Sequence, residues 1–397
     1  MSRDDVVIVG GGPAGSATAL LLARAGHDVL LLERYAFPRA KPCGDCLSPG
    51  ANAILRRLGV FNDVLRAGPA HLRGWQLIAP GGPHFGVEFA DITSQDDYSL
   101  AIRRDVFDAV LLERARAEGV RVAHGVHVRG LLRDDAGAIT GVRGTREGAE
   151  VEFAARIVVG ADGVRSGVAR QLSAHSRSPR LRKASFTLHA RLDRGLPVGE
   201  MRLGSGACLG IAPIDDQPAG VHNITLVLHE SALDRHTGPR AILEAGLRRF
   251  GVDVHVNGDR ILASGPFDWP VRNIAFDGAA LVGDAAGYYD PFTGQGIYQA
   301  LAGAEALADN LDGALRNGAV TRATLKPYVE AHKRQRTHTK RLQQIIEFVC
   351  AHPRVANLVF ERCNRNRNAA GQLMAATADL LPADSLFSAR FLLRLLT

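Results

Sequence analysis

The hydrophobic and polar positions at the start of the chain predict a strand, a tight turn, a helix and a second strand. Residues 6–9, VVIV, are an uninterrupted apolar run typical of a buried strand. Residues 10–15 follow with the pattern G-x-G-x-x-G, and residues 17–26, ATALLLARAG, have helical character and end in glycine. A further apolar run, DVLLLE at residues 28–33, completes the unit. This order is typical of a nucleotide-binding β-α-β unit.

The glycine turn between the first strand and the helix is suited to a dinucleotide. Gly10, Gly12 and Gly15 let the backbone turn sharply and approach a pyrophosphate, while the helix N-terminus presents unpaired N–H groups to it. Glu33 lies 18 residues past Gly15, where a carboxylate can accept hydrogen bonds from a ribose diol. This acid favours FAD or NAD over NADP, a preference that the neighbouring Arg34 weakens.

Later segments predict a second sheet and a helical C-terminus. Five segments alternate or run apolar as strands do, which suggests an antiparallel sheet over the nucleotide site: GWQLIAP, PHFGVEFA, ASFTLHARL, ACLGIAPI and HNITLVLHE. Helical patterns replace them after residue 305. The last stretch, ARFLLRLLT at residues 389–397, mixes arginines with large apolar residues, so it can pack on the core or lie in a membrane interface.

The composition is that of an ordinary globular protein. The chain has 397 residues, of which 46% are hydrophobic and 22% charged, enough for one large or two intermeshed domains. Five cysteines do not make a disulfide framework in a protein of this size, so a reducing cytoplasm is the expected compartment. Residues 6–23 carry no charge, but two aspartates precede them and glycines interrupt them, which argues against a signal peptide or a membrane anchor.

The basic residues are concentrated at the C-terminal end. Residues 321–397 hold 13 Lys or Arg and 5 Asp or Glu, a net charge of +8 against +7 for the whole chain. Solvated helix faces account for such an excess, and so does attraction to an anionic surface. The second interpretation predicts peripheral contact of this basic region with the inner face of a membrane. No feature of the chain predicts a nucleic-acid partner.

Two later motifs extend the nucleotide site. Residues 157–169 read IVVGADGVRSGVA and residues 281–301 read LVGDAAGYYDPFTGQGIYQAL, and each begins as a short apolar strand. With the glycine turn, they resemble in order and spacing the three nucleotide fingerprints of the FAD-dependent aromatic hydroxylase superfamily, which has the p-hydroxybenzoate hydroxylase fold. FAD, bound non-covalently, is therefore the expected cofactor.

This resemblance implies a fold and a division into domains. The fold class is α/β, with an α+β substrate part. The expected units are a discontinuous Rossmann-like FAD-binding domain of residues 1–70, 100–175 and 270–310, an interleaved antiparallel-sheet substrate domain of residues 71–99 and 176–269, and a helical region of residues 311–397.

The resemblance also implies a role for each motif. Asp162 and Gly163 support the pyrophosphate region, Asp284 binds the ribityl chain, and the loop Gly294-Gln295-Gly296-Ile297 faces the isoalloxazine ring with its N–H groups. An anionic reduced flavin needs donors near N1 and O2, which a helix N-terminus supplies. The expected cofactor contacts are Gly10, Gly12, Pro13, Ala14, Gly15, Glu33, Arg34, Cys43, Gly44, Asp45, Arg104, Asp162, Gly163, Asp284, Pro291, Gly294, Gly296 and Ile297.

Residues 41–49, KPCGDCLSP, look most like the geranylgeranyl reductase group, whose members saturate double bonds of prenyl chains on lipids or quinones. The resemblance places Cys43 beside the reactive face of the flavin as the candidate catalytic proton donor or substrate contact; the alternative is a small residue that only packs. Cys46 departs from the pattern of the group, and a disulfide with Cys43 stays open. No second ligand pair accompanies the CxxC, so no metal site is expected. Asp45 or Ser48 is expected to cap the helix that follows.

The chain departs from the reductase group at residues 208–213, CLGIAP. The group has Y-x-W-x-F-P at this point, and flavin halogenases have W-x-W-x-I-P. An aliphatic wall still suits an apolar ligand.

The main functional hypothesis is an FAD-dependent oxidoreductase that reduces C=C bonds of an apolar prenyl, polyene or lipid-like substrate by hydride transfer from reduced flavin. One alternative is a monooxygenase that hydroxylates an aromatic or polyketide substrate through a flavin hydroperoxide. Another is a non-catalytic flavin redox or interaction module. No second nucleotide-binding unit follows the first, so either NAD(P)H docks transiently or an electron-donor protein supplies the electrons.

Overall fold

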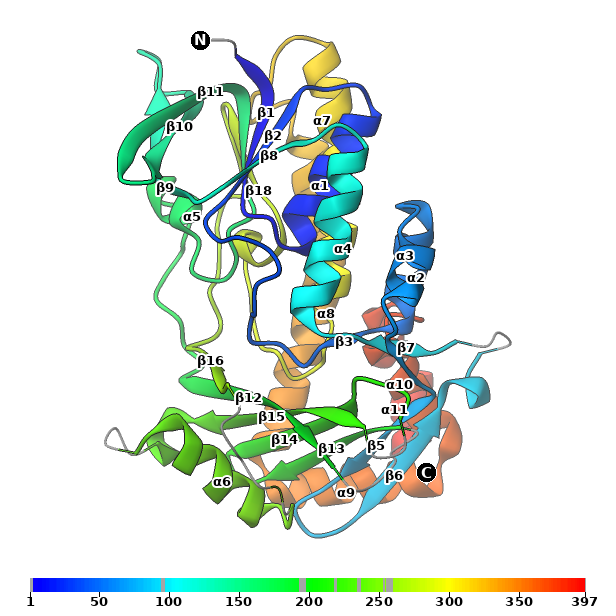
Figure 1. Cartoon of the computed structure of the whole chain (residues 1–397). Helices are drawn as coiled ribbons and strands as arrows, with labels where there is room; N and C mark the ends of the chain where they lie inside the picture. Colours follow the sequence, from blue (N-terminus) through cyan, green and yellow to red (C-terminus); the bar gives the residue numbers. More distant parts are fainter. Residues whose placement is uncertain are drawn as a thin grey trace.

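The structure is a computed structural model and describes residues 3–93, 97–192, 198–217, 220–233, 237–252, 254 and 260–396. Figure 1 shows two bodies built on β-sheets, one above the other, with the long helix α8 (Lys326–Ala351) passing from the upper body to the lower one. The N-terminus lies in the upper body, and the last helices lie beside the lower body.

The upper body is an eight-stranded sheet with a parallel centre. Its order is β17-β18-β11-β1-β2-β8, and β10 and β9 extend the sheet from β11. The strands are β1 (Asp4–Val9), β2 (Val29–Glu33), β8 (Arg121–His124), β9 (Val126–Arg133), β10 (Ile139–Arg146), β11 (Ala149–Gly160), β17 (Ala275–Phe276) and β18 (Ala279–Leu281). Val6, Val7 and Ile8 of β1 are fully buried, which confirms the prediction of a buried first strand.

Three helices cover one face of this sheet. They are α1 (Pro13–Arg24), α4 (Arg104–Ala117) and α7 (Gly296–Arg316), and they lie together on the right of Figure 1. α1 packs against both other helices. Their apolar faces and the parallel strands together form the largest hydrophobic core.

The lower body is a seven-stranded sheet with the order β16-β12-β15-β14-β13-β5-β6. The strands are β5 (Gly74–Ile78), β6 (His84–Glu88), β12 (Lys183–Arg191), β13 (Gly199–Gly204), β14 (Ala207–Pro213), β15 (Val221–His229) and β16 (Leu262–Ser264). The predicted strands that are neighbours pair antiparallel, but β13, which was not among the predicted strands, runs parallel to β5. The chain crosses the upper body between these two strands, so no hairpin imposes an antiparallel pairing on them. Helix α6 (Pro239–Arg249) packs on this sheet through Leu243 and Leu247.

Shorter elements join the two bodies. β3 (Cys46–Leu47), β4 (Ala70–Leu72) and β7 (Ser99–Ala101) form a three-stranded sheet beside α2 (Pro49–Arg57) and α3 (Phe61–Arg66). The remaining short helical segments are η1 (Phe89–Asp91), α5 (Gly167–Gln171), η2 (Glu230–Ala232) and η3 (Gly283–Ala286).

The C-terminal region is helical, as predicted. After α8 come α9 (Pro353–Arg365), α10 (Arg367–Thr377), η4 (Ala383–Phe387) and α11 (Ala389–Leu396). In α11, Phe391 is buried in a small core while Leu393 is 64% exposed, so this helix packs on the protein with one side only. In the described part of the chain, no helix combines the length and apolar character needed to cross a bilayer. The Rossmann-like sheet, the further sheets and the helical C-terminus confirm the predicted fold class.

One buried hydrogen bond gives a test of this packing. The hydroxyl of Tyr328 in α8 is fully buried and donates to the carbonyl of Leu281 at the end of β18, at 2.6 Å. We expect Tyr328→Phe to lower the free energy of unfolding by about 1–2 kcal/mol, because a buried carbonyl loses its partner. Urea denaturation measures this change. Tyr35→Phe, at a 54% exposed side chain, is the matched control, and an equal effect of both substitutions would contradict the assignment.

Candidate cofactor and substrate site

A large cavity of about 420 Å³ lies between the two bodies. The glycine turn after β1, the loop around Cys43 and the start of α7 line one end of it, which we call the flavin end. The lower sheet and the C-terminal helices line the other, which we call the apolar end. Of the predicted cofactor contacts, the cavity wall includes Gly12, Pro13, Ala14, Cys43, Gly44 and Arg104, and also Gly163, Asp284, Pro291, Gly294, Gly296 and Ile297.

The glycine turn has a backbone geometry that only glycine permits. Gly10 has a φ of +107°, and a Cβ at Gly15 would lie 1.9 Å from the carbonyl oxygen of Gly10. α1 begins at Pro13, has no acidic residue in its first turn and has no side chain capping its N-terminus. The backbone N–H groups in the first turn of α1 are therefore available to an anion such as a pyrophosphate.

Glu33 is held at the edge of this turn. Its carboxylate accepts hydrogen bonds from the backbone N–H groups of Gly11 at 2.8 Å and Tyr35 at 3.0 Å. Arg34, predicted as a cofactor contact, is exposed, and its guanidinium lies over the Tyr35 ring. The cation near Glu33 is instead Arg39, 3.6 Å away, which the sequence analysis missed. A basic residue soon after the second strand was the only signal for it.

Asp162 does not line the cavity. Its carboxylate accepts hydrogen bonds from the N–H groups of Gly167 at 2.6 Å and Val168 at 3.2 Å, so it stabilises the start of α5. Gly163, next to it, has a φ of +83° and does line the cavity. The turn thus places backbone, and not the acid, against the flavin end.

The start of α7 leaves open space. A Cβ at Gly294 or Gly296 would meet nothing within 4 Å, although both residues line the cavity. Asp284, in η3, lines the same end. The open space beside a helix N-terminus and the free start of α1 fit the flavin and the phosphates of FAD respectively.

Arg104 is buried and remains charged. Its guanidinium donates to both carboxylate oxygens of Asp108, at 2.8 and 2.9 Å, and it also reaches the thiol of Cys43. Burial alone would lower the pKa of Arg104, but the Asp108 carboxylate raises it more. Burial raises the pKa of the Cys43 thiol and Arg104 opposes that shift, so the thiol keeps its proton at neutral pH.

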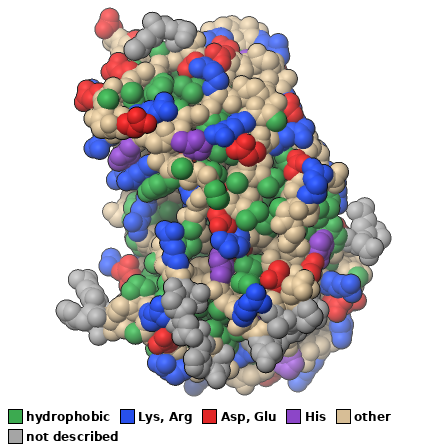
Figure 2. Space-filling model, viewed as in Figure 1, with side chains coloured by type: hydrophobic (Ala, Val, Ile, Leu, Met, Phe, Trp, Pro, Cys, Tyr) green, Lys and Arg blue, Asp and Glu red, His purple; other side chains and the backbone are tan. Residues whose placement is uncertain are grey.

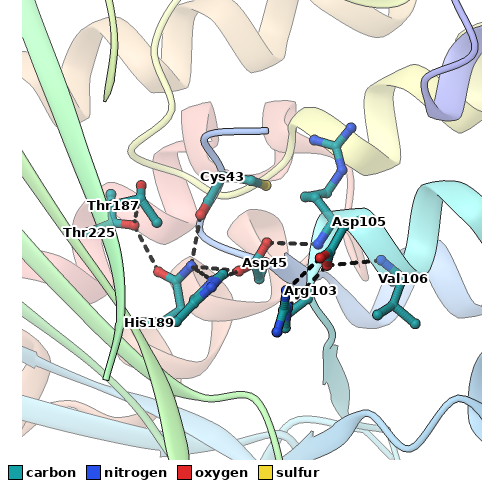
Figure 3. A network of polar contacts seen from close by, with 10 residues as sticks. Cys43, Asp45, Arg103, Asp105, Val106, Thr187, His189 and Thr225 are labelled. Atoms are coloured by element: carbon teal, nitrogen blue, oxygen red, sulfur yellow. Dashed lines mark hydrogen bonds and ion pairs between the residues drawn. The ribbon is translucent and has the colours of Figure 1, made fainter. Parts of the chain in front are cut away.

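Asp45 anchors the Cys43 loop to the lower sheet (Figure 3). Its carboxylate accepts from the backbone N–H of Arg104 at 3.1 Å and from the side-chain amide of Asn223 at 2.7 Å, and it forms a 2.5 Å contact with Nε2 of His189. Asn223 also donates to the carbonyl of Cys43 at 2.8 Å. In Figure 3 this carbonyl points toward the network, and the thiol of Cys43 points away from it.

Two expectations about this loop need correction or completion. Asp45 does not cap α2, because its side chain faces α4 and the lower sheet; Ser48 occupies the N-cap position, but its side chain does not cap the helix either. His189 and Asn223 were missed. The alternation of Ser185, Thr187 and His189 along one strand was the available signal, since it places three polar side chains on one face. All five cysteines, including Cys43 and Cys46, are free thiols in the structure.

Lys41 is a further residue that the sequence analysis missed. It lines the flavin end and forms no hydrogen bond or ion pair with the described residues. Its Nζ lies 3.5 Å from the position of a Cβ on Gly163. Burial lowers the pKa of Lys41, and Arg104 adds to that effect while Asp284 opposes it. An anionic phosphate group would supply the counter-charge that this ammonium lacks.

The apolar end is lined by aromatic and aliphatic side chains. Aromatic residues come from segments outside the predicted aliphatic strip and include Trp75, Phe85, Phe89, Phe267, Phe292 and Phe360. From β14, Cys208, Gly210, Ile211 and Ala212 line the cavity as expected of an aliphatic wall. The C-terminal helices add Leu342, Ile345, Val349, Met374, Phe391 and Leu395. Such a cavity is suited to an apolar chain.

Comparisons with known proteins show the family of the chain and its cofactor. The FAD binding domain family matches residues 3–195. Digeranylgeranylglycerophospholipid reductase 1 of Methanopyrus kandleri is 32% identical over 320 residues, which are 75% of this chain and 77% of the relative. Menaquinone reductase of Mycobacterium tuberculosis is 30% identical over 343 residues, 78% of this chain and 76% of the relative.

Solved structures share the fold. The flavin-dependent brominase Bmp2 has a TM-score of 0.80 at 20% identity, with 97% of both chains covered. The myxobacterial chondrochloren halogenase CndH has a TM-score of 0.78 at 22% identity, with 100% of this chain and 96% of that chain covered. At these identities the likeness concerns the fold alone.

The fold, the glycine turn and the family match define an FAD-dependent oxidoreductase. Within that class, the chain belongs to the geranylgeranyl reductase family.

The unpartnered ammonium of Lys41 provides a test of the cofactor site. We expect Lys41→Met to weaken FAD binding by about 10- to 100-fold, because a charge-assisted contact is worth about 1.5–3 kcal/mol. Titration of the apoprotein with FAD, followed by flavin fluorescence, measures this. Lys333→Met, at an exposed position of α8, is the matched control. An unchanged affinity in Lys41→Met would show that this ammonium does not face the cofactor.

Proposed function

We propose that this protein reduces C=C bonds of an apolar prenyl, polyene or other lipid-like chain. The observation that carries the proposal is the continuity of one cavity, from the Cys43 thiol at its flavin end to the aromatic and aliphatic walls at its apolar end. Two relatives, a digeranylgeranylglycerophospholipid reductase and a menaquinone reductase, support a substrate of this class.

The residues of the chain have distinct tasks in this reaction. FAD, when bound and reduced, would supply the hydride that one carbon of the double bond receives. The Cys43 thiol donates a proton to the other carbon, and the resulting thiolate recovers a proton from solvent. Arg104 stabilises that thiolate, while Asp45 and Asn223 hold the loop that carries it. The apolar walls exclude water and orient the chain.

The electrons come from outside the chain. We propose that NAD(P)H docks transiently at the flavin or that an electron-donor protein reduces it, because the sequence contains one G-x-G-x-x-G unit. Enzyme that has been reduced by either donor should then transfer electrons to an apolar alkene in the absence of oxygen.

Anaerobic half-reactions test the proposal. Enzyme reduced with dithionite should be reoxidised by a prenyl-chain lipid, and Cys43→Ser should slow this step about 100-fold, as expected for the loss of a general acid. The rate should fall only at a pH above the usual thiol range, because burial raises the pKa of Cys43. Cys363→Ala, at a buried cysteine outside the cavity, is the control.

Two results would contradict the proposal. The first is a reduced enzyme that no prenyl lipid reoxidises without oxygen but that consumes oxygen in proportion to an aromatic substrate, which is the behaviour of a monooxygenase. The second is an unchanged flavin spectrum and rate with every apolar substrate tested, which is the behaviour of a redox or interaction module.

We also propose that the C-terminal helices dock on an anionic lipid surface. Six large apolar side chains in this region are exposed, namely Ile345, Phe348, Leu358, Leu381, Phe387 and Leu393. Ile345 is 48% exposed and also lines the cavity, so the apolar end reaches the surface here. Arg341, Ile345 and Phe348 recur at helical spacing and are exposed along α8, and the exposed His352 follows at the end of this helix.

Charge supports the same partner. Residues 321–397 carry a net charge of +8, whereas Figure 2 shows basic and acidic side chains interspersed over the face of the molecule that it presents. A cationic region with exposed apolar side chains is suited to the headgroup layer of an anionic membrane. A lipid-like substrate could then enter the cavity beside Ile345 without crossing water.

Vesicle binding tests the lipid surface. The double variant Phe348→Asp with Leu393→Asp should bind vesicles of phosphatidylglycerol and phosphatidylcholine at least tenfold more weakly, because both side chains are more than half exposed and would carry negative charge. Co-sedimentation measures this, and Tyr35→Asp, in the upper body, is the control. Failure of the unmodified protein to bind these vesicles at low salt would overturn the proposal.

A further inference from the structure

Asp379 joins the C-terminal region to two segments of the flavin end, the Cys43 loop and the loop that leads into α7. It lies between α10 and η4, and its carboxylate accepts hydrogen bonds from the Ser48 hydroxyl at 2.6 Å and from the Gln295 amide at 2.7 Å. The backbone approaches equally closely: the N–H of Gly50 donates to the carbonyl of Ala378 at 3.1 Å. A Cβ at Gly50 would lie 2.4 Å from the carbonyl oxygen of Asp379.

The two partners of Asp379 belong to the loops that carry the proposed chemistry. Ser48 follows the Cys43 loop and is the N-cap residue of α2. Gln295 stands between Gly294 and Gly296 and is the N-cap residue of α7. Neither side chain caps its own helix. The Asp379 carboxylate therefore lies near two helix N-termini, where a negative charge is stabilised.

No cation among the described residues offsets this carboxylate. The groups that face it are the neutral Ser48 and Gln295, and Tyr298 of α7, whose pKa is raised by burial and further by Asp379. Farther along these helices, Arg57 and Glu305 pair with each other. Burial raises the pKa of Asp379 to about 7, and its two hydrogen bonds oppose that shift. A buried carboxyl without a counter-ion, beside a cofactor site, is a functional candidate.

We propose that Asp379 is a positioning residue that ties the C-terminal helices to the two loops of the flavin end and sets the reduction potential of the bound flavin through its charge. The inference rests on the proposed FAD site. The N-terminus of α7 can stabilise negative charge on reduced flavin, and an ionised Asp379 at that same N-terminus opposes it. Protonation of Asp379 removes this opposition, so reduction becomes easier as the pH falls.

The potential of the flavin as a function of pH tests this. In Asp379→Asn holoenzyme, the equilibrium between oxidised and reduced flavin should shift toward the reduced form by about tenfold above pH 7, which is about 30 mV for a two-electron couple. Well below pH 7 the variant and the unmodified protein should agree, because Asp379 is then neutral in both. Equilibration with a reference dye at a series of pH values measures this, and Asp384→Asn, at an exposed carboxyl of η4, is the control.

A second variant, Ser48→Ala, keeps the proposal testable if Asp379→Asn does not fold. The Oε1 atom of Gln295 is buried and has no partner among the described residues, so its amide can rotate to accept from an asparagine at position 379. Ser48→Ala removes one hydrogen bond that favours the ionised carboxyl, so the pH-dependent step should move to higher pH. Equal potentials for Asp379→Asn and the unmodified protein at every pH, or a step that moves to lower pH in Ser48→Ala, would overturn the proposal.

Thermal unfolding supplies a readout independent of flavin chemistry. A carboxyl whose pKa is raised on folding stabilises the protein fully below its unfolded pKa, and this contribution is lost as the pH rises through about 7. Asp379→Asn should therefore flatten the loss of thermal stability between about pH 4 and pH 7. If no prenyl lipid reoxidised the reduced enzyme while the flavin potential kept its dependence on pH and on Asp379, the proposed function would be wrong and the role of Asp379 would stand.

Discussion

The carboxylate of Asp45 is the interaction on which the site depends. It accepts from the backbone at the start of α4 in the upper body and from Asn223, and it contacts His189, both on strands of the lower body. A buried carboxylate without donors costs several kcal/mol, so this arrangement penalises any displacement of the two bodies. The Cys43 loop is held in the same network, and its thiol therefore has a defined position relative to both ends of the cavity.

Among the described residues, one basic and one acidic side chain near the flavin end have no oppositely charged partner. Arg104 is neutralised by Asp108, but Lys41 lies at the cavity without a partner among the described residues. Asp379 carries the opposite charge, also without a counter-ion, near the start of α7. A positive group near the expected phosphates and a titrating negative group near the expected flavin ring would affect binding and reduction separately, because screening is weak in a buried site.

The parts of the site that short sequence segments carry could be predicted. The strand, the G-x-G-x-x-G turn and the helix depend on local backbone geometry, and the Gly10 and Gly15 contacts show why no other residue fits there. Predictions of which element a given side chain would contact were less successful than these local predictions. Arg34 neighbours Glu33 in sequence but is exposed, and Asp45 reaches across to α4 and the lower sheet and does not cap the adjacent helix.

The sequence by itself determined that the chain binds a dinucleotide and how its first strands and helix follow one another, because glycine turns, apolar runs and their spacing act within about 30 residues of chain. Only the tertiary structure decided which distant residues come together at the cavity or directly behind its wall. Lys41, Asn223 and Asp379 come from a loop, a sheet and the C-terminal region, and their roles depend on contacts across 178 and 331 positions of the chain. Packing selects such contacts through burial and hydrogen-bond satisfaction, which no local pattern records.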